Sequence, residues 1–273
     1  MFRRVFALPL IAVLWSVFGP AQVSAVPPAL AVQDVRTADG LAVEVVGDPS
    51  TAATVVVLVP GAGTTAANFD RGLGGVQRRA PAWQAAQLAT AAGPDVAVIA
   101  WLGYHPPEGI RLDAVREDVA ATGAAALLRF LRDVPAPRIV LVGHSYGSTV
   151  IGRAAARLDA GTGGHVTDIV VLGSPGMGVD RAADLRTTAR VWAGTAAGDW
   201  TRRLPGLRIL GAGHGTHPTD PAFGALPLPV DGVTGHDGYF VPGTASLDAL
   251  AAIANGDLDA AARHGHQLVP HLR

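Results

Sequence analysis

The chain of 273 residues contains no cysteine and no lysine, and aromatic residues make up only 5% of it. Without cysteine there is no disulfide framework and no thiol to which a lipid could be attached. The 21 basic residues, all arginine, nearly balance 22 acidic ones, so the formal net charge is −1. This balance gives no electrostatic reason to expect a nucleic-acid partner. Hydrophobic residues make up 49% of the chain, which indicates a globular protein stabilised by its core alone.

The first 25 residues differ from the rest of the chain. Two arginines near the start supply positive charge, Val5–Phe18 is almost wholly apolar, and small or compact residues stand at 23–25. This order is typical of a secretory signal peptide, cleaved here before Val26. The apolar run is shorter than the ~20 residues that a bilayer requires. We therefore expect an exported, secreted protein with no stable membrane insertion after cleavage, and an uncleaved membrane anchor is the alternative.

Strand patterns alternate with helical patterns from Thr54 onward. The strand patterns are apolar on both faces, as central parallel strands are. They occupy 54–59, 96–102, 138–143, 168–174 and 190–194, with 207–211 as a weaker candidate. The helical patterns occupy 82–93, 110–132, 148–158 and 246–256. This alternation predicts one α/β domain with a mostly parallel, doubly wound sheet flanked by helices.

The segments outside these patterns complete the expected organisation. Two β-prone runs around Asp39 and Gly40 predict a hairpin before the first central strand. The last residues are polar with scattered histidines, and we expect them to fray. The predicted division is a signal peptide at 1–25, a lead-in and hairpin at 26–53, the α/β domain at 54–258, and a C-terminal tail at 259–273.

A single serine stands between two glycines where the strand pattern at 138–143 gives way to the helical pattern at 148–158. The stretch Gly143–Gly147 reads GHSYG, with Ser145 at its centre. The chain must turn sharply there, and glycine, which has no Cβ, fits the flanking positions. This context is typical of a nucleophile elbow, which lifts the serine hydroxyl above the carboxyl edge of the sheet. Ser145 is the candidate nucleophile, and a turn serine that caps a helix is the alternative.

A serine nucleophile needs a general base, and the base needs an acid to orient it. In the α/β-hydrolase fold these residues follow the serine in the order acid, then histidine. Asp199 lies in the loop directly after the strand pattern at 190–194, which is the expected place for the acid. Asp180 and Asp184 follow the preceding strand pattern and are the runners-up.

Seven histidines follow Ser145, and their places relative to the strand and helical patterns distinguish the candidate base from the others. His236 lies in a loop just before the last helical pattern, where this fold places its catalytic histidine. His165 precedes a strand pattern and belongs to the wrong edge of the sheet. Three more lie in the tail, at His264, His266 and His271. We therefore predict His236 as the general base.

The two remaining histidines, His214 and His217, follow the weak strand pattern. They could shape the pocket or its loop. Their spacing and the nearby Asp220 also allow a metal site, but the segment resembles a loop rather than a helix face. We expect neither a metal nor a cofactor.

The loop after the strand pattern at 54–59 consists of small residues whose backbone can approach a substrate closely. In this fold such a loop supplies one N–H group of the oxyanion hole, and the residue after the nucleophile supplies the other. By position, we assign the N–H groups of Ala62 and Tyr146. Gly61 or Gly63 could replace Ala62, and a simple tight turn is the alternative. The expected substrate-binding residues are Gly61, Gly63, His144 and His214.

Seven blocks together resemble an uncharacterised family of α/β-hydrolases from actinobacteria. They read VPGAGTT, AWLGYHPP, GHSYGSTVIG, LGSPGMGV, AGTAAGDW, GHGTHPTDPAFGA and GHDGYF, and the resemblance runs from about Thr54 to Gly256. It implies a serine hydrolase with Ser145 as nucleophile and is consistent with Asp199 and His236. One departure is the block GYHPP, where His105 replaces the acid that such sequences usually have.

The leading interpretation is a secreted, esterase-like serine hydrolase that cleaves an ester or related acyl bond through an acyl-enzyme on Ser145. Its partner would be a small-molecule or lipid-like ester, and the absence of a long apolar insertion before His236 favours small or accessible esters. The alternatives are an acyltransferase with the same three residues and a non-catalytic secreted binding protein. The presence of serine, aspartate and histidine in the expected order favours catalysis. The sequence indicates no oligomeric state.

Overall fold

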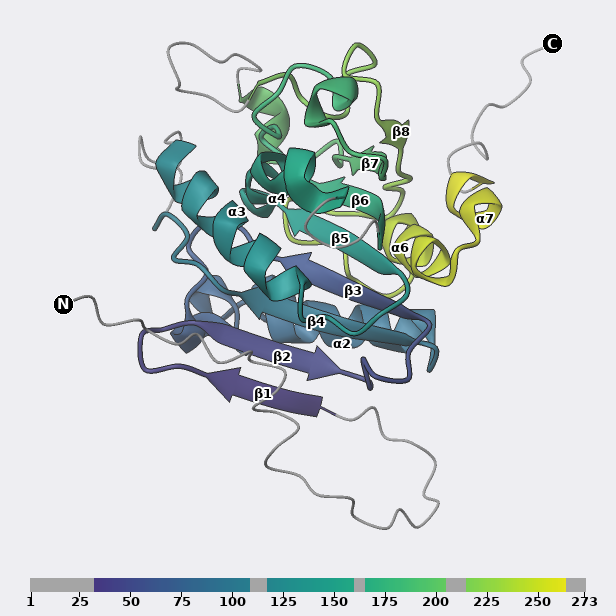
Figure 1. Ribbon diagram of the computed structural model, residues 1–273. Helices are drawn as coiled ribbons and strands as arrows, with labels where there is room; N and C mark the ends of the chain where they lie inside the picture. Colours follow the sequence, from purple (N-terminus) through teal and green to yellow (C-terminus); the bar gives the residue numbers. More distant parts are fainter. Residues whose placement is uncertain (1–31, 109–116, 160–164, 205–214, 264–273) are drawn as a thin grey trace.

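The computed structural model describes residues 32–108, 117–159, 165–204 and 215–263 (Figure 1). The predicted signal peptide at 1–25, the weak strand pattern at 207–211 and His214 lie outside the described residues. Within the described part of the chain, no helix is both long and apolar enough to cross a bilayer.

Eight strands form one sheet in the described residues, in the order β1-β2-β4-β3-β5-β6-β7-β8. Their bounds are β1 (Val32–Arg36), β2 (Ala42–Val46), β3 (Thr54–Val59), β4 (Val96–Leu102), β5 (Ile139–His144), β6 (Val166–Leu172), β7 (Arg190–Gly194) and β8 (Leu226–Pro227). The hairpin of β1 and β2 joins β4 in antiparallel fashion, and every other pairing is parallel. The mostly parallel sheet predicted from the sequence is confirmed.

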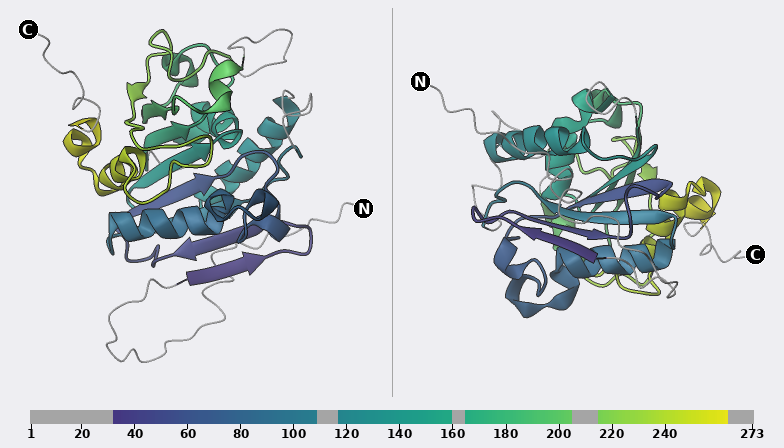
Figure 2. Two further views of the ribbon diagram at one scale, coloured as in Figure 1. Left: turned by 180° about the vertical axis from the view of Figure 1, so that it is seen from behind. Right: turned by 60° about the horizontal axis from the view of Figure 1, so that its bottom comes forward.

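Helices cover both faces of this sheet (Figures 1 and 2). The α-helices are α2 (Pro81–Ala92), α3 (Glu117–Leu131), α4 (Gly147–Ala154), α6 (Ala245–Asn255) and α7 (Leu258–Arg263). The short 3-10 helices are η1 (Ala66–Asn68), η2 (Leu73–Gly75), η3 (Gln77–Arg79), η5 (Ala155–Arg157), η6 (Ala182–Leu185) and η7 (Trp200–Arg203). Helices α3 and α4 pack on one face of the sheet, and α2, α6 and α7 pack on the other.

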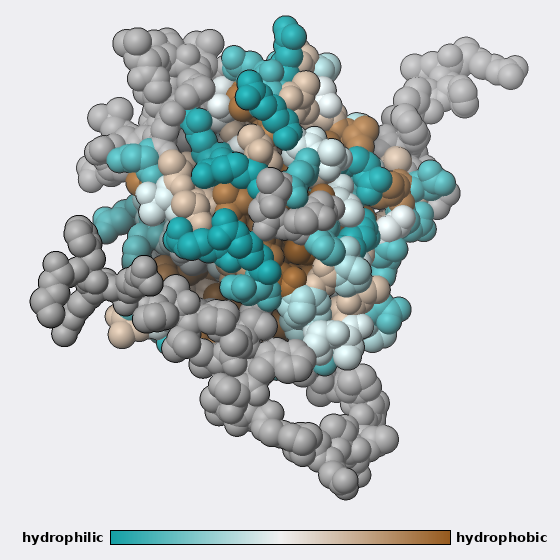
Figure 3. Space-filling view, in the orientation of Figure 1, coloured by the Kyte–Doolittle hydropathy of each residue, from teal (hydrophilic) through white to brown (hydrophobic). Residues whose placement is uncertain are grey.

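Burial of both sheet faces explains why the central strands read as continuous apolar runs. Every residue of β3 and of β4 is buried, and alternate side chains enter the core on opposite faces. On the face drawn in Figure 3, hydrophilic side chains cover most of the described surface, and hydrophobic ones are visible between them. The exposed large hydrophobic side chains of the described residues are Leu73 and Leu226.

The structure differs from the expected C-terminal tail at its first residues. Helix α7 crosses the expected boundary, so the first residues of the segment 259–273, assigned as a C-terminal tail, are helical as far as Arg263. Asp257 begins this helix, because its side chain accepts a hydrogen bond from the N–H of Ala260 at 2.9 Å. Ala261 is fully buried against the core. Burial of one small apolar side chain and a capping aspartate therefore order residues for which the sequence analysis predicted no helix.

Parallel strands align their carboxyl ends at one edge of the sheet and their amino ends at the other. A buried ion cluster lies near the amino edge, centred on Asp168 of β6, whose side chain is 0% exposed. Arg138 and Arg190 each donate hydrogen bonds to its carboxylate at 2.7–2.8 Å, and Trp192 donates at 3.0 Å. Arg138 also donates to the carbonyls at the end of α6. This cluster ties together β5, β6, β7 and α6.

Candidate active site

Ser145 lies at the carboxyl edge, between the end of β5 and the start of α4. Its φ is 54°, a left-handed conformation that only one other non-glycine residue, Arg186, adopts in the described chain. Such a backbone is strained for an L-residue and is typical of a functional turn. Two residues later, a Cβ on Gly147 would lie only 2.1 Å from the carbonyl oxygen of Val59. The strand-to-helix turn expected from GHSYG is present, with glycine where the chain passes against β3.

Asp199 and His236 lie side by side at the same edge. Nδ1 of His236 is 2.9 Å from both carboxylate oxygens of Asp199. Asp199 follows β7 and begins η7, where its Oδ1 accepts hydrogen bonds from the backbone and the hydroxyl of Thr201. Tyr239 donates its hydroxyl to Oδ2 at 2.5 Å. The carboxylate is therefore held from three sides.

The electrostatic state of this pair follows from its partners. Burial raises the pKa of Asp199, but hydrogen bonds from His236, Tyr239 and Thr201 outweigh it and lower the pKa to about 2. Asp199 is thus ionised at neutral pH and accepts a proton-bearing Nδ1 of His236. This bond fixes the tautomer of the imidazole and leaves Nε2 as the proton acceptor.

Two aromatic rings position the His236 imidazole. The centroid of the Trp200 indole lies 4.8 Å from the centroid of the His236 imidazole, and that of the His144 imidazole lies 4.7 Å from it. The His144 ring also lies beside the ring of Tyr239. Nε2 of His144 is 2.8 Å from the backbone carbonyl of His236. Burial, followed by the nearby His236, lowers the pKa of His144 to about 4. His144 is therefore neutral at pH 7 and donates its Nε2–H to the loop that carries His236.

Gly173, directly after β6, allows the acid and the histidine to meet. A Cβ at this position would lie 2.6 Å from Oδ2 of Asp199 and 2.9 Å from Nδ1 of His236. Both distances are shorter than atoms can approach, so any side chain here would push the pair apart. Gly173 could not be identified from the sequence, because Asp199 and His236 come from loops that are distant from it along the chain.

The loop after β3 faces the nucleophile. A Cβ on Gly61 would lie 2.7 Å from the Cβ of Ser145, which places the backbone of this loop against the serine. The N–H of Gly63 already donates to the carbonyl of Pro107 at 2.8 Å. In contrast, the N–H of Ala62 has no acceptor among the described residues. The N–H of Ala62 is therefore available to a ligand in the cavity, whereas that of Gly63 is engaged. Tyr146, the other assigned donor, is the N-cap residue of α4.

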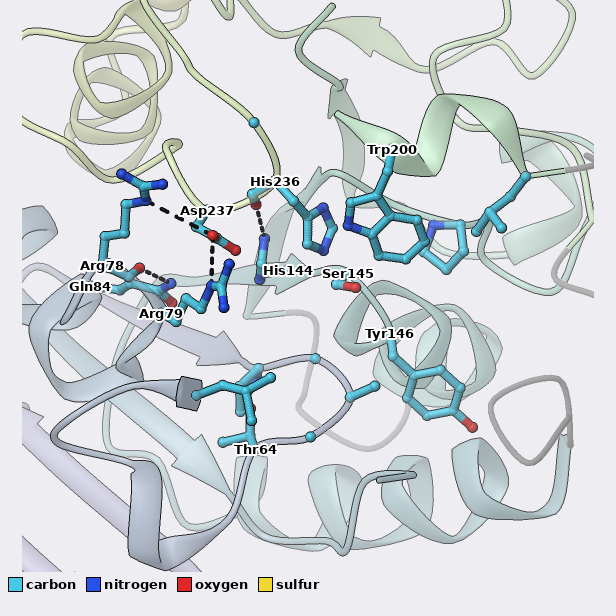
Figure 4. Close-up of a pocket in the computed structure, with 18 of the residues that line it drawn as sticks. Thr64, Arg78, Arg79, Gln84, His144, Ser145, Tyr146, Trp200, His236 and Asp237 are labelled. Carbon is cyan, nitrogen blue, oxygen red and sulfur yellow. Dashed lines mark hydrogen bonds and ion pairs between the residues drawn. The ribbon is translucent and has the colours of Figure 1, made fainter. Parts of the chain in front are cut away.

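These residues share one cavity of about 560 Å³ (Figure 4). Ser145 and His236 both line it. So do Gly61, Ala62, Gly63, His144 and Tyr146 from the set of site residues expected from the sequence. Asp199 lies behind His236, with a side chain that is 0% exposed. Lining residues that the sequence analysis did not identify include Leu73, Arg78, Arg79, Trp200 and Leu204.

Among the other candidates that the structure describes, the cavity is not lined by Asp180, Asp184 or His217. Asp180 lies 3.4 Å from the hydroxyl of Thr216, and Asp184 lies in η6. Nε2 of His217 is 2.9 Å from the carbonyl of Leu204, so this ring contacts the backbone of a cavity-lining residue. His105, at the unusual GYHPP block, does not line the cavity.

No group of three metal-ligating side chains occurs in the described part of the chain. His165, near the amino edge, is exposed and lies 3.2 Å from the carbonyl of Pro137. His214 is outside the described residues, so the metal alternative at His214, His217 and Asp220 stays untested.

Comparison with known proteins gives relatives in mycobacteria. The chain is 30% identical over 260 residues to an uncharacterised protein of Mycobacterium tuberculosis, a match that covers 83% of this chain and 38% of the relative. It is 37% identical over 121 residues to an uncharacterised protein of Mycobacterium bovis, covering 41% of this chain and 42% of the relative. The matches thus span about two fifths of the length of these relatives.

Three solved structures are similar to the chain at low sequence identity. One is a dienelactone hydrolase from Anabaena variabilis, with 17% identity and a TM-score of 0.47 over 84% of this chain and 96% of the other. The carboxyl esterase 2 of Tuber melanosporum has 11% identity and a TM-score of 0.49 over 88% and 89%. A serine hydrolase of Xanthomonas campestris described as lacking a lid has 15% identity and a TM-score of 0.44 over 91% and 100%.

A family model described as alpha/beta hydrolase matches residues 36–209. This match includes the elbow at Ser145 and the loop of Asp199, and it ends before His236. The mycobacterial relatives agree with the resemblance to uncharacterised actinobacterial proteins that the sequence blocks indicate. By its fold and by this match, the chain belongs to the α/β-hydrolase family.

Proposed function

We propose that this protein is a serine hydrolase that cleaves a carboxylic ester through an acyl-enzyme on Ser145. The observation that supports it most is the pairing of an ionised Asp199 with His236 at the wall of the cavity in which Ser145 occupies a strained turn. A protein that only binds a ligand has no need to bury a carboxylate against an imidazole beside a strained serine.

The proposed reaction begins with attack by Ser145 on the substrate carbonyl. Its Oγ forms a bond to the carbonyl carbon while its proton passes to Nε2 of His236, and the positive imidazolium is stabilised by Asp199. The N–H groups of Ala62 and Tyr146 would hold the negative carbonyl oxygen of the tetrahedral intermediate. The carbon–oxygen bond to the alcohol then breaks, and the departing alkoxide takes the proton from His236.

Water completes the cycle. It loses a proton to Nε2 of His236 as it attacks the acyl carbon, and the second tetrahedral intermediate collapses to release the carboxylic acid. The proton returns to Oγ of Ser145, so the enzyme is restored and one ester has consumed one water. Asp199 keeps its charge throughout, which its low pKa allows.

We also propose that the protein is secreted, with residues 1–25 removed as a signal peptide. Intact-mass analysis of protein collected from the medium of an expressing actinobacterium should give a chain that begins at Val26. Recovery of a chain with Met1 in the membrane fraction would contradict both the cleavage site and the secretion.

The activity is tested with p-nitrophenyl esters of increasing acyl length. The wild-type protein should release p-nitrophenolate, and Ser145→Ala should reduce turnover by about 10³-fold or more with little change in melting temperature. Equal turnover by both proteins would contradict the proposal. The series also tests the expected preference for short or accessible esters over long-chain ones.

A further inference from the structure

The cavity around Ser145 has two chemically different ends. In Figure 4, the rings of His144 and His236 lie between these two ends. One end contains Arg78, Arg79 and Asp237, and the other contains Trp200. The first end is charged and comes from η3 and from the loop of His236. The second end is apolar and comes from η7 and its neighbours. A substrate held across Ser145 would therefore meet opposite chemistry at its two ends.

The charged end carries two cations and one anion. Nε of Arg79 donates to Oδ2 of Asp237 at 2.7 Å, and Nε of Arg78 lies 3.9 Å from the same oxygen. The carboxylate of Asp237 thus pairs with two guanidinium groups. These three side chains, which we call the arginine wall, together carry one unbalanced positive charge. The side chain of Arg78 is 47% exposed and that of Arg79 is 38% exposed, against 12% for Asp237.

Most donor groups of this arginine pair remain available. A guanidinium has five N–H donors in a planar fork, and only Nε of Arg79 has a hydrogen-bond acceptor among the described residues. Glu108 is the other acid that lines the cavity. It follows Pro107 beside Gly63, and no ion pair joins it to an arginine in the described chain. Among the ion pairs of the described residues, Arg78 and Arg79 both have Asp237 as their partner.

The wall is built by buried contacts rather than by an unsupported loop. Gln84, only 2% exposed, donates its side-chain amide to the carbonyl of Arg78 at 2.9 Å. The N–H of Arg79 donates to the carbonyl of Val76, and that of Ala80 donates to Gln77, which closes the turns of η3. The backbone of both arginines is thereby fixed at the rim of the cavity.

We propose, on the basis of the hydrolase function above, that Arg78 and Arg79 bind a carboxylate of the substrate. The preferred substrates would then be esters that carry a free carboxylate at one end of a short chain. The planar guanidinium fork matches the two oxygens of a carboxylate. The single unbalanced charge of the wall suits a monoanion better than a dianionic phosphate. A cavity of about 560 Å³ has the size of a small-molecule site.

Matched pairs of substrates test this proposal. The mono-p-nitrophenyl esters of adipic, pimelic and suberic acids each carry a distal carboxylate, and methylation of that carboxylate gives neutral partners of nearly equal shape. The measured quantity is the ratio of kcat/KM for the acid to kcat/KM for its methyl ester. Because both members of a pair use the same reacting groups, any general disturbance of the site cancels in this ratio.

The wild-type protein should prefer the acid by about tenfold or more at one chain length at least, the size expected for a hydrogen bond to a charged group. In the double variant Arg78→Gln, Arg79→Gln the ratio should fall towards one. Arg71→Gln is the matched control, since Arg71 donates to the carbonyl of Ala67 and does not line the cavity, and it should keep the wild-type ratio. Raising NaCl from about 0.05 M to about 0.5 M should lower the wild-type ratio through screening.

The outcomes separate this proposal from the hydrolase function. A wild-type ratio near one, with the neutral esters still cleaved by a Ser145-dependent reaction, overturns the carboxylate site alone. So does a ratio that survives in the double variant, since the preference would then come from elsewhere. If the double variant does not fold, the single variant Arg78→Gln, which removes no hydrogen bond, must still lower the ratio. Turnover no greater than that of Ser145→Ala overturns both proposals.

Discussion

Two aspartates of this sheet, Asp168 and Asp199, share a physical state and differ in their partners. Both side chains are 0% exposed. Burial raises the pKa of each, and hydrogen bonds to the carboxylate outweigh it and lower each pKa to about 2. Asp168, near the amino edge, is held by two arginines and a tryptophan. Asp199, at the carboxyl edge, is held by a histidine, a tyrosine and a threonine.

The partners decide what each carboxylate can do. Arginine stays protonated in proteins, so the charges around Asp168 stay the same at all ordinary pH values and no group there takes up or releases a proton. His236 lines the cavity with Ser145, and in our proposal it takes the proton of the serine hydroxyl and passes it on. The same buried carboxylate therefore stabilises the fold at one edge and, in our proposal, orients a base at the other.

The largest expected effect lies at the carboxyl edge. Asp199→Asn keeps the shape of the side chain but removes the charge that holds the proton on Nδ1 of His236. Turnover of p-nitrophenyl esters should fall on the order of 10³-fold or more, with KM little changed. His236→Ala should cause a similar loss, and neither variant combined with Ser145→Ala should be much worse than Ser145→Ala alone. Retention of most activity by His236→Ala would show that the base has been misassigned.

The corresponding change at the amino edge should affect stability and spare activity. Asp168→Asn leaves Arg138 and Arg190 without a balancing charge. Breaking a buried ion pair costs about 3–5 kcal/mol, and partial exposure of both arginines brings the expected loss to about 2 kcal/mol. Urea unfolding followed by tryptophan fluorescence should show a lower midpoint with an unchanged slope. An unchanged midpoint would contradict the role of Asp168 in stabilising the fold.

Acid should weaken the fold through both aspartates. Each folded pKa, about 2, lies below the ordinary value of 3.8. Each ionised carboxylate therefore contributes stability that is fully present above about pH 4 and is lost as the pH falls towards 2. The free energy of unfolding should decline over this interval, and it should decline less in Asp168→Asn than in the wild type. Parallel declines in the two proteins would mean that Asp168 is not linked to folding.

The smallest expected effect concerns the tether from His144 to the loop of His236. His144→Ala removes one neutral hydrogen bond, which is worth up to about tenfold in turnover, and KM should change little. His144→Gln, whose amide can donate to the same carbonyl, should restore part of the loss. Since the pKa of His144 is about 4, its loss should leave the shape of the pH–rate profile unchanged near neutrality. Full activity in His144→Ala would exclude a positioning role.

Local chain geometry explains what could be predicted from the sequence. The strands at 54–59, 96–102 and 190–194 were predicted with the bounds that the structure has, because central strands are apolar on both faces. The elbow at Ser145 was predictable because its glycines and serine are adjacent in the chain. The fixed order of loops in a doubly wound sheet made Asp199 and His236 candidates, and the structure brings these two together.

Contacts between distant parts of the chain could not be predicted in this way. Arg79 and Asp237 are 158 residues apart, and each on its own resembles a solvated loop charge. Tyr239 donates its hydroxyl to the carboxylate of Asp199, 40 residues before it. From the sequence, Tyr239 and Phe240 indicate only two neighbouring aromatic residues in the core. The cluster around Asp168 was not identified for the same reason, since an aspartate within a strand pattern gives no sign of its partners.

The proposed hydrolase function requires Ser145 to be the nucleophile, and covalent labelling tests this directly. A fluorophosphonate probe should react with the folded protein, and trypsin should release the adduct on the peptide Ile139–Arg153, since cleavage follows Arg138 and Arg153. That peptide contains two serines, Ser145 and Ser148, which fragmentation by mass spectrometry separates. We expect the added mass on Ser145, slower labelling in Asp199→Asn, and none in Ser145→Ala. An adduct on any other residue, or labelling that persists in Ser145→Ala, would contradict the account.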